Sequence, residues 1–350
     1  MTPTAPKVCI VILNWNNLSD TLECLRAIKN LEYPNRESVV VDNGSVDGSA
    51  EQIKAAYPAI TMLSNATNLG YTGGCNVGLA WAIQHGADYI WLLNNDTVVT
   101  PDCLTRLVDL GERYPNIGLI SPAIHFHHEP EQVQFRGTAI DEPPYHVPRI
   151  APLDPARAAM TGDLLLVGTA LLVKRAVLTA IGPLDDRYFA YCEDWDYCLR
   201  ARRAGYAVAV EPLARVFHKL AGSLGESSPV KEYLMARNRY LVWRTHLSGW
   251  SRLTYRGRYL AWVLERVHEA RLGGQDSVAV AALDGAWDAF RGRFGPPPGS
   301  RMPGPVRSLF FALLAWHPFL WTMLLRLDFA GIAIQTAGRL FRRLSSRRHT

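Results

Sequence analysis

Short apolar runs alternate with stretches of helical periodicity in the first part of the chain. Residues 8–13 form a β-branched run, which predicts a strand buried on both faces. Apolar residues then recur at helical spacing from Leu18 to Ile28. The alternation repeats, and it predicts strands at 38–42, 60–63 and 89–93 and helices at 47–56 and 74–84. This β-α-β-α order predicts an α/β fold in which helices flank an open, mostly parallel sheet.

The middle of the sequence is less regular. Residues 125–153 are rich in Pro and His and lack periodicity, so we expect a long loop there. Strands are predicted at 168–173 and 206–210. A helix is predicted between them, from Glu193 to the terminating Gly205.

The last third of the chain is helical in pattern. The pattern runs over residues 228–294, and the Gly-Pro-Pro-Pro-Gly run at 295–299 ends it. A very apolar stretch and a basic end follow. We therefore expect an α/β domain at 1–227, a helical extension at 228–298 and an apolar, basic tail at 299–350.

The composition is that of an ordinary globular protein. Hydrophobic residues make up 48% and charged residues 20% of the 350 residues. A net charge of +5 is too mild to indicate nucleic-acid binding. The six cysteines include no Cys-x-x-Cys pair, which argues against a zinc site or a disulfide framework and favours a reducing compartment. The N-terminal end has no apolar run of signal-peptide length, so we expect a cytoplasmic location.

The basic excess is concentrated at the C-terminal end. From Arg301 onward the sequence has eight arginines and the single acid Asp328. Residues 309–325 are apolar but contain Pro318, and they fall short of the ~20 residues that a spanning helix needs. We expect an amphipathic or shallowly inserted helix that holds the protein on the anionic, cytoplasmic face of the plasma membrane. A buried core helix is the alternative.

Polar residues follow three of the predicted strands, at the edge where an open α/β sheet binds its ligands. They are Asn14-Trp15-Asn16, Asp42-Asn43-Gly44 and Asn94-Asn95-Asp96. Asp96 in such a position can hold a divalent cation that bridges two phosphates. The alternative is a turn that caps the next helix, since Asn and Asp favour both roles. The coincidence of three polar strand ends favours the ligand site.

Asp42 and the glycine-rich segment 68–78 suggest how a nucleotide is held. An acid at the end of the second strand commonly accepts hydrogen bonds from a nucleoside, and a local Asx turn at Asp42 is compatible with that role. No Gly-x-Gly-x-x-Gly follows the first strand, which disfavours a dehydrogenase-type dinucleotide site. Glycines in the segment 68–78 either let backbone N–H groups approach an anion or serve as structural turn residues.

Glu193, Asp194 and Asp196 lie in the first turn of a predicted helix. Acids there complement the helix dipole, which is the structural interpretation. Asp196 precedes Arg200 by four residues, so we expect the two to pair. Asp194 lies on a different face and is the better candidate for a general base that takes a proton from a hydroxyl. His218 is a candidate for a second metal ligand or a diphosphate contact, although a lone His is more often structural.

In this order the motifs resemble family 2 of the glycosyltransferases, an inverting group with the GT-A fold, and most closely its bacterial rhamnosyltransferase branch. The resemblance covers roughly residues 8–241. Its motifs are the strand 8–13 with Asn14-Trp15-Asn16, Val41 to Ser45, Asn68 to Asn76, Leu93 to Asp96, Gly168 to Ala170, Phe189 to Arg200, Phe217 to Lys219, and Arg237 to Arg239. The family's Asp-x-Asp is here Asn94-Asn95-Asp96. A single carboxylate should hold the metal weakly until the donor diphosphate adds oxygens.

The resemblance implies a role for each of these positions. Asp194 would be the general base, with Glu193 beside it, and Asp96 and His218 would hold Mg²⁺ or Mn²⁺. Donor-binding positions would be Asp42 at the base, Asn95 at the ribose or phosphates, and also Asn14, Trp15, Asn16, Asn68, Gly70, Gly74 and Asn76. The implied reaction is a single in-line displacement at the anomeric carbon of a nucleotide-diphosphate sugar.

The expected reaction within this family is rhamnose transfer from dTDP-rhamnose to a hydroxyl of a glycan or polyprenyl-linked acceptor, in cell-surface polysaccharide synthesis. A sugar-phosphate nucleotidyltransferase is the alternative enzyme. It would carry a Gly-rich loop with Arg or Lys directly after the first strand, and residues 14–17 contain none of these. A non-catalytic nucleotide-sugar-binding membrane scaffold stays open from the motifs, and metal-dependent release of a nucleoside diphosphate would exclude it.

Overall fold

The computed structural model describes residues 5–139, 159–161, 164–220, 228–297, 304–306 and 309. The chain divides into two compact units. One comprises Met1–Lys231 with Phe294–Pro297, and the other comprises Glu232–Arg293 with Pro298–Thr350. Each unit is described separately.

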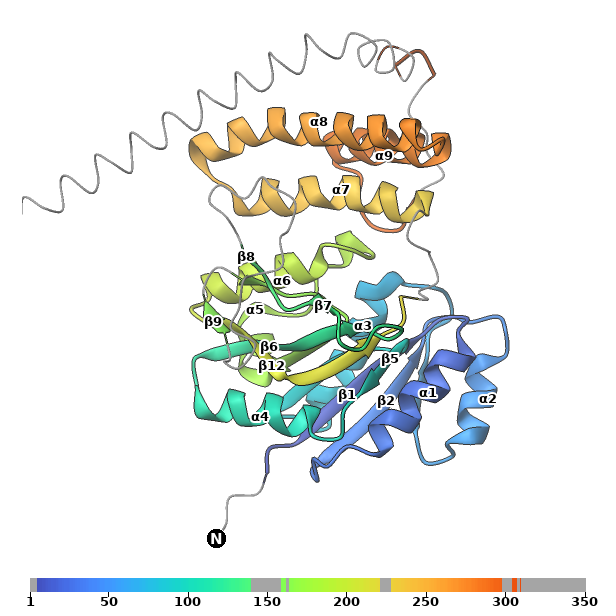
Figure 1. The fold of residues 1–350 in the computed structure, drawn as a ribbon, viewed down its shortest axis with the longest axis vertical. Helices are drawn as coiled ribbons and strands as arrows, with labels where there is room; N and C mark the ends of the chain where they lie inside the picture. Colours follow the sequence, from blue (N-terminus) through green and yellow to red (C-terminus); the bar gives the residue numbers. More distant parts are fainter. Residues whose placement is uncertain are drawn as a thin grey trace, which may run out of the picture. The chain divides into compact units, whose positions relative to one another are not determined.

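The first unit is built on a single large sheet, one part of which is parallel (Figure 1). The parallel strands are β1 (Val8–Asn14), β2 (Arg36–Asp42), β3 (Thr61–Ser64) and β4 (Tyr89–Asn94). β1 pairs with β2 on one side and with β4 on the other, and β3 lies beyond β2. The register sets Asn14 opposite Asp42 and Leu13 opposite Asn94. The polar strand ends therefore lie side by side, as the sequence predicts.

The rest of the sheet is mixed. Its strands are β5 (Thr97–Val99), β6 (Ile117–Phe126), β7 (Val133–Phe135), β9 (Ala159–Thr161), β11 (Ala170–Lys174) and β12 (Ala207–His218). β11 pairs antiparallel with β4 and β6, β12 runs parallel to β6, and β5 pairs antiparallel with β12. The predicted α/β sheet with flanking helices is confirmed, and its parallel pairs join β1–β4 and, separately, β6 with β12. A separate ladder joins β8 (Thr138–Ala139) to β10 (Leu164–Leu165).

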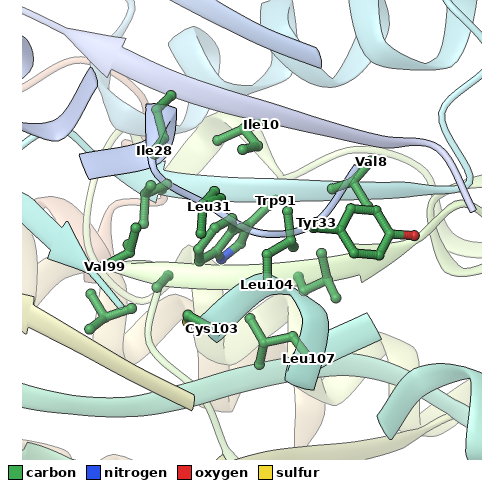
Figure 2. Close-up of a cluster of buried hydrophobic side chains, with 14 of the residues drawn as sticks. Val8, Ile10, Ile28, Leu31, Tyr33, Trp91, Val99, Cys103, Leu104 and Leu107 are labelled. Atoms are coloured by element: carbon green, nitrogen blue, oxygen red, sulfur yellow. The ribbon is translucent and has the colours of Figure 1, made fainter. Parts of the chain in front are cut away.

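Helices cover both faces of the sheet around β1. They are α1 (Leu18–Lys29), α2 (Ser49–Ala56), α3 (Gly70–Gln84), α4 (Cys103–Arg113), α5 (Arg175–Ile181) and α6 (Glu193–Arg203), with a short 3₁₀ turn, η1 (Asp186–Tyr188). Figure 2 shows Val8 and Ile10 of β1 in one buried cluster with Ile28 of α1 and with Leu104 and Leu107 of α4. This packing explains why the first strand is a continuous apolar run.

The opposite face of β1 meets α3 at very short range. A Cβ on Gly78 would lie 2.2 Å from Cγ1 of Val11, and a Cβ on Gly74 would lie 2.4 Å from Cδ1 of Leu13. A side chain at either position would force Val11 or Leu13 to move, so the glycines permit this short distance between helix and sheet. Part of the glycine-rich pattern is therefore explained by packing.

The order in which the chain adds strands to the sheet reverses at β1, because β2 and β3 lie on one side of β1 and β4 lies on the other. In open α/β sheets, ligands bind beyond the carboxyl ends of the strands at such a reversal. Asn14 ends β1 and Asn94 ends β4, and Asn95 and Asp96 follow directly. The topology thus points to the same residues as the motifs do.

Several element boundaries differ from the predictions. α3 begins at Gly70 rather than near residue 74, and β12 continues to His218. The prediction of a loop at 125–153 was wrong where it includes the end of β6 and the short strands β7 and β8. Strands of two or three residues are too short to show alternation. Residues 140–153 of that segment lie outside the described residues.

The second unit is helical, which confirms the predicted helical C-terminal region. Its helices are α8 (Gly249–Leu272), α9 (Asp276–Phe290) and most of α7 (Pro229–His246), and α8 packs along α9 (Figure 1). Tyr240 centres an aromatic cluster, with its ring centroid 4.9 Å from those of Tyr259 and Phe290. The Tyr233 hydroxyl donates a hydrogen bond of 2.7 Å to Oδ2 of Asp288 inside this unit.

The expected membrane tail at 299–350 lies almost entirely outside the described residues. Within the part of the chain that the structure describes, no helix combines the length and apolar character needed to cross a membrane. All six cysteines are buried and free, in agreement with the expectation of no disulfide framework.

Candidate active site

Asn14, at the end of β1, is the centre of a buried hydrogen-bond network. Its side chain is fully buried, and its Nδ2 lies 2.9 Å from Oδ1 of Asp42, to which it donates. The same amide nitrogen lies 2.9 Å from the hydroxyl oxygen of Ser49 and 3.1 Å from that of Ser45. This hydrogen bond from Asn14 therefore fixes the orientation of the Asp42 carboxylate. The predicted donor-binding residue Asn14 supports the site through Asp42.

Thr21 extends this network to β4. Its hydroxyl lies 2.9 Å from Oδ1 of Asn14, and it accepts a hydrogen bond of 2.8 Å from Nδ2 of Asn95. Thr21 is itself fully buried on α1. The chain Asp42–Asn14–Thr21–Asn95 thus joins β2, β1, α1 and the end of β4. Sequence reasoning missed Thr21, because a threonine on the buried face of a helix carries no distinguishing signal.

The loop after β1 and the loop after β2 hold each other in place. The backbone N–H of Asn16 donates to the Ser45 hydroxyl, and Oδ1 of Asn16 accepts from the backbone N–H of Val46. The backbone N–H of Ser45 donates to Oδ2 of Asp42 over 3.2 Å, so the predicted local turn at Asp42 is present. Trp15 is half-buried in the first of these loops.

The asparagines of the glycine-rich segment are engaged within the protein. Oδ1 of Asn68 accepts from Nδ2 of Asn43 and from the backbone N–H of Gly70, so it fastens the start of α3 to the end of β2. The Asn76 amide donates to the Leu184 carbonyl and to Oδ1 of Asp186. These contacts give Asn68 and Asn76 a structural role within the protein. Donor binding by either side chain stays a prediction.

Gly70 holds the turn that leads into the predicted catalytic acids. It has φ +75°, and a Cβ there would lie 2.4 Å from the Phe189 carbonyl oxygen. The same oxygen accepts a hydrogen bond of 3.0 Å from the backbone N–H of Thr72. Phe189, Tyr191 and Cys192 have φ between 63° and 69°, a conformation that costs energy outside glycine. Backbone strain of this kind is characteristic of functional sites.

Asp96 and His218 meet because β5 pairs with β12. The pairing sets His218 opposite Thr97, and the backbone N–H of Lys219 donates to the Asp96 carbonyl over 3.0 Å. Nε2 of His218 then lies 3.2 Å from Oδ1 of Asp96. Asp96 is 4% exposed. The two predicted metal ligands, far apart in the sequence, are therefore neighbours.

The chemistry of this pair fits a divalent cation. A carboxylate oxygen and an imidazole nitrogen are both ligands for Mn²⁺, and ligands on adjacent corners of an octahedron with bonds of about 2.1 Å lie about 3 Å apart. No cluster of three or more His, Cys, Asp or Glu side chains suited to a metal occurs among the described residues. The described residues offer Asp96 and His218 as ligands there, and oxygens of the donor and water could fill further positions.

The two acids at the start of α6 differ in environment. Glu193 is 5% exposed, and its Oε2 has no hydrogen-bond partner among the described residues. Burial, together with the charge of Asp194, raises the pKa of Glu193 well above its ordinary value. Burial of this kind favours the protonated form of a carboxyl.

Asp194 is half-buried and has partners for its charge. Its Oδ2 accepts from the backbone N–H of Gly168 over 2.9 Å, and its Oδ1 accepts from the backbone N–H of Trp195 over 2.8 Å. Burial raises the pKa of Asp194 to about 6, and the two backbone donors oppose that rise. Asp194 therefore ionises before Glu193, a division of roles typical of catalytic carboxyl pairs.

The expected ion pair on α6 is confirmed. Nε of Arg200 donates to Oδ2 of Asp196 over 2.7 Å, and Arg200 also donates to the carbonyls of Ile181 and Pro183. Asp196 is thus a structural residue that anchors α6 to the segment before it. The i,i+4 spacing separated it correctly from Asp194.

Lys219, the residue after His218, joins the site to α1. Its Nζ lies 2.7 Å from Oδ1 of Asp20 and 2.5 Å from Oε2 of Glu23. These contacts fix the end of β12 against the helix that carries Thr21. Gln134 of β7 also reaches the site, with its Oε1 3.0 Å from Nδ1 of His218. Sequence analysis did not identify Gln134, because it lies in a segment without periodicity.

Comparison with known proteins identifies the family and the fold. Residues 9–181 match the model of the family described as Glycosyl transferase family 2. The N-acetylglucosaminyl-diphospho-decaprenol L-rhamnosyltransferase of Mycobacterium tuberculosis is 26% identical over an alignment of 244 residues, which covers 62% of this chain and 78% of that protein. The low-salt glycan biosynthesis hexosyltransferase Agl10 of Haloferax volcanii is 25% identical over an alignment of 242 residues, which covers 67% of this chain and 74% of that protein.

Among solved structures, GalNAc-T7 crystallised with UDP, GalNAc and Mn²⁺ superimposes with a TM-score of 0.54 at 16% sequence identity. The superposition covers 68% of this chain and 51% of GalNAc-T7, so this chain spans about half of that protein. At this identity the similarity concerns the fold alone. The chain is therefore a glycosyltransferase of the GT-A fold, and its residues 9–181 form a domain of glycosyltransferase family 2.

Proposed function

We propose that this protein is an inverting, cation-dependent glycosyltransferase that moves a sugar from a nucleotide-diphosphate donor to an acceptor hydroxyl. The observation that carries the proposal is the contact between Oδ1 of Asp96 and Nε2 of His218 at the reversal point of the sheet. A carboxylate and an imidazole at that point can hold Mg²⁺ or Mn²⁺, which supplies charge neutralisation for the leaving nucleoside diphosphate.

The donor is assigned to the strand ends. The Asp42 carboxylate, oriented by Asn14, accepts hydrogen bonds from the base, and the Asn95 amide contacts the ribose or the phosphates. Trp15 and Asn16 border this position from the loop after β1. Their arrangement around one buried network supports a preformed nucleotide site. Asn68, Gly70, Gly74 and Asn76 shape the site from α3.

Asp194 is assigned as the general base. Each of its oxygens accepts one backbone hydrogen bond and retains a lone pair for an acceptor hydroxyl. As the acceptor oxygen bonds to the anomeric carbon, its proton passes to Asp194 and the bond from that carbon to the phosphate oxygen breaks. A single displacement of this kind inverts the anomeric centre. Glu193 remains protonated and lowers the negative charge next to the base.

The proposed donor is dTDP-rhamnose and the proposed acceptor is a glycan or polyprenyl-linked sugar of a cell-surface polysaccharide. The support is the relative that is a decaprenol-diphosphate-linked rhamnosyltransferase. The basic tail at 299–350 would bring the enzyme to the cytoplasmic face of an anionic membrane, where lipid-linked acceptors lie. In this proposal residues 1–227 are the catalytic domain and 228–298 the helical extension.

The test is donor turnover by the purified full chain against a panel of nucleotide sugars, with dTDP-rhamnose first and UDP-sugars next. Wild type should release nucleoside diphosphate only when Mg²⁺ or Mn²⁺ is present. Asp96→Asn should raise the half-saturating metal concentration, whereas Asp109→Asn, an exposed carboxylate on α4, should not. Undiminished turnover in EDTA, or an Asp96→Asn enzyme with wild-type metal dependence, would refute the cation site.

A further inference from the structure

Gln134 approaches the candidate cation site from a strand that the sequence did not predict. It is the middle residue of β7, which pairs antiparallel with β6 through Ile124 opposite Phe135 and His125 opposite Val133. A backbone hydrogen bond of 3.1 Å from Phe126 to Gln132 continues this ladder. The backbone on both sides of Gln134 is thus fixed, and its side chain reaches His218, with Oε1 3.0 Å from Nδ1.

The main chain of His218 is also held, so its ring orientation is what remains to be determined. Its carbonyl accepts a hydrogen bond of 3.0 Å from the backbone N–H of His127, and β5 and β6 pair with it on either side. Rotation about the side-chain bonds is not restricted by these contacts. A hydrogen bond to one ring nitrogen restricts it.

The contact with Gln134 also decides which ring nitrogen carries the proton. An amide oxygen can only accept, so Nδ1 of His218 must donate to it. In a neutral imidazole the other nitrogen, Nε2, then presents a lone pair. Nε2 lies 3.2 Å from Oδ1 of Asp96, and in this neutral tautomer both atoms are acceptors. Two acceptors cannot bond to each other, but both can bind one cation.

The reverse orientation of the amide has the opposite consequence. If the Gln134 amide nitrogen faced Nδ1, the ring proton would move to Nε2 and would be donated to Asp96. A hydrogen bond between the two ligands would then occupy the lone pair that a cation needs. The orientation of the Gln134 amide therefore determines whether Nε2 of His218 is free to bind a cation or is hydrogen-bonded to Asp96.

We propose that Gln134 is a positioning residue that holds His218 in the Nδ1-protonated tautomer, with Nε2 free to bind a divalent cation together with Asp96. The inference rests on the proposed cation site. Outer hydrogen bonds to metal-binding histidines commonly contribute 10- to 100-fold to metal affinity. Gln134 supplies such a bond here across two neighbouring strands.

The first measurement is the tautomer of His218 in the metal-free full chain. Long-range ¹H–¹⁵N correlation on protein labelled at histidine distinguishes the two tautomers, and a His218→Ala variant assigns the signal. Wild type should show Nδ1–H, and Gln134→Leu should lose this preference. Gln132→Leu, which changes an exposed glutamine two residues earlier, should leave it intact. A wild-type ring protonated at Nε2, or an unchanged tautomer in Gln134→Leu, would overturn the proposal.

The second measurement is Mn²⁺ affinity in the presence of a nucleoside diphosphate, read from the signal of free Mn²⁺ in electron paramagnetic resonance. Gln134→Leu should weaken binding about 10- to 100-fold. Gln134→Glu keeps an acceptor toward Nδ1 and should restore most of the affinity. Wild-type affinity in Gln134→Leu would contradict the inference. If the tautomer behaves as expected but no variant binds Mn²⁺, the positioning of His218 stands and the proposed cation site falls.

Discussion

Gly70 lies directly against the backbone carbonyl of Phe189, so closely that a Cβ on Gly70 would come within 2.4 Å of the carbonyl oxygen. This contact fastens the N-terminal end of α3 to the strained turn that precedes Glu193 and Asp194. Gly70 therefore connects the start of α3, on the proposed donor side of the site, to the turn that precedes the proposed catalytic acids. Gly70, which the sequence motif suggested for donor binding, thus contacts the turn that precedes the proposed base.

Gly70→Ala should consequently impair both stability and transfer. Gly86→Ala is the matched control, because Gly86 has the same φ of +75° but no atom within 4 Å of an added Cβ. The control should lose about 1–2 kcal/mol from the left-handed conformation alone. Gly70→Ala should lose about 1–3 kcal/mol more, because the Phe189 backbone must move. Thermal unfolding and donor turnover measure the two effects, and equal losses in both variants would contradict the account.

Thr21 should matter for the donor site through its hydroxyl. Thr21→Val keeps the shape but removes the link between Asn14 and Asn95, and we expect a loss of about 1–3 kcal/mol in stability with weaker donor binding. Thr21→Ser keeps the hydroxyl and should retain donor affinity. Calorimetric titration with the nucleoside diphosphate compares them. Equal affinity in the valine and serine variants would show that the link does not position Asn95.

The two acids of α6 should respond differently to neutralisation. Asp194→Asn should fold and lose transfer by about 10²–10⁴-fold, the usual contribution of a general base. Glu193→Gln should keep kcat within about tenfold, since Glu193 is expected to be neutral in the active enzyme. Initial rates at saturating donor and acceptor distinguish these outcomes. Near-normal turnover in Asp194→Asn, or loss of transfer in Glu193→Gln, would reverse the assignment.

The raised pKa of Asp194 predicts two pH effects. Transfer should decline as the pH falls below about 6, because a protonated carboxyl cannot accept the hydroxyl proton. The stability of the folded state changes with pH in the opposite direction. The pKa of Asp194 is about 6 in the folded protein, above the ordinary 3.8, so this group stabilises the folded state at pH values below 3.8. That stabilisation is lost as the pH rises through about 6.

The stability effect is measurable as a difference. The unfolding temperature of Asp194→Asn minus that of wild type should increase between about pH 4 and about pH 7, since the variant has no charge to bury. Taking the difference removes the constant cost of any hydrogen bond that the asparagine cannot make. A difference that is flat across this range would show that burial does not shift the pKa of Asp194.

Much of the fold could be read from local patterns, and the exceptions have clear causes. The strands β1 and β4 are almost entirely buried and β2 is buried from Val39 to Asp42, and their apolar runs predict them directly. β7 escaped detection because three residues cannot establish a period. Gln134, which this strand delivers to His218, was missed with it. Thr21 was missed because the hydrogen-bond partners that give its hydroxyl a role lie on other elements and leave no mark in the local sequence.

Local sequence patterns specify the α/β order, the polar strand ends, the spacing that pairs Asp196 with Arg200 and the ordered motifs of the family, because each is a property of neighbouring residues. Which distant side chains meet depends on how the elements pack. The pairing of β5 with β12 brings His218 to Asp96, and the Phe189 turn packs on Gly70. Burial decided that Asp194 ionises before Glu193, because removal of water acts on a carboxyl only once the chain has folded around it.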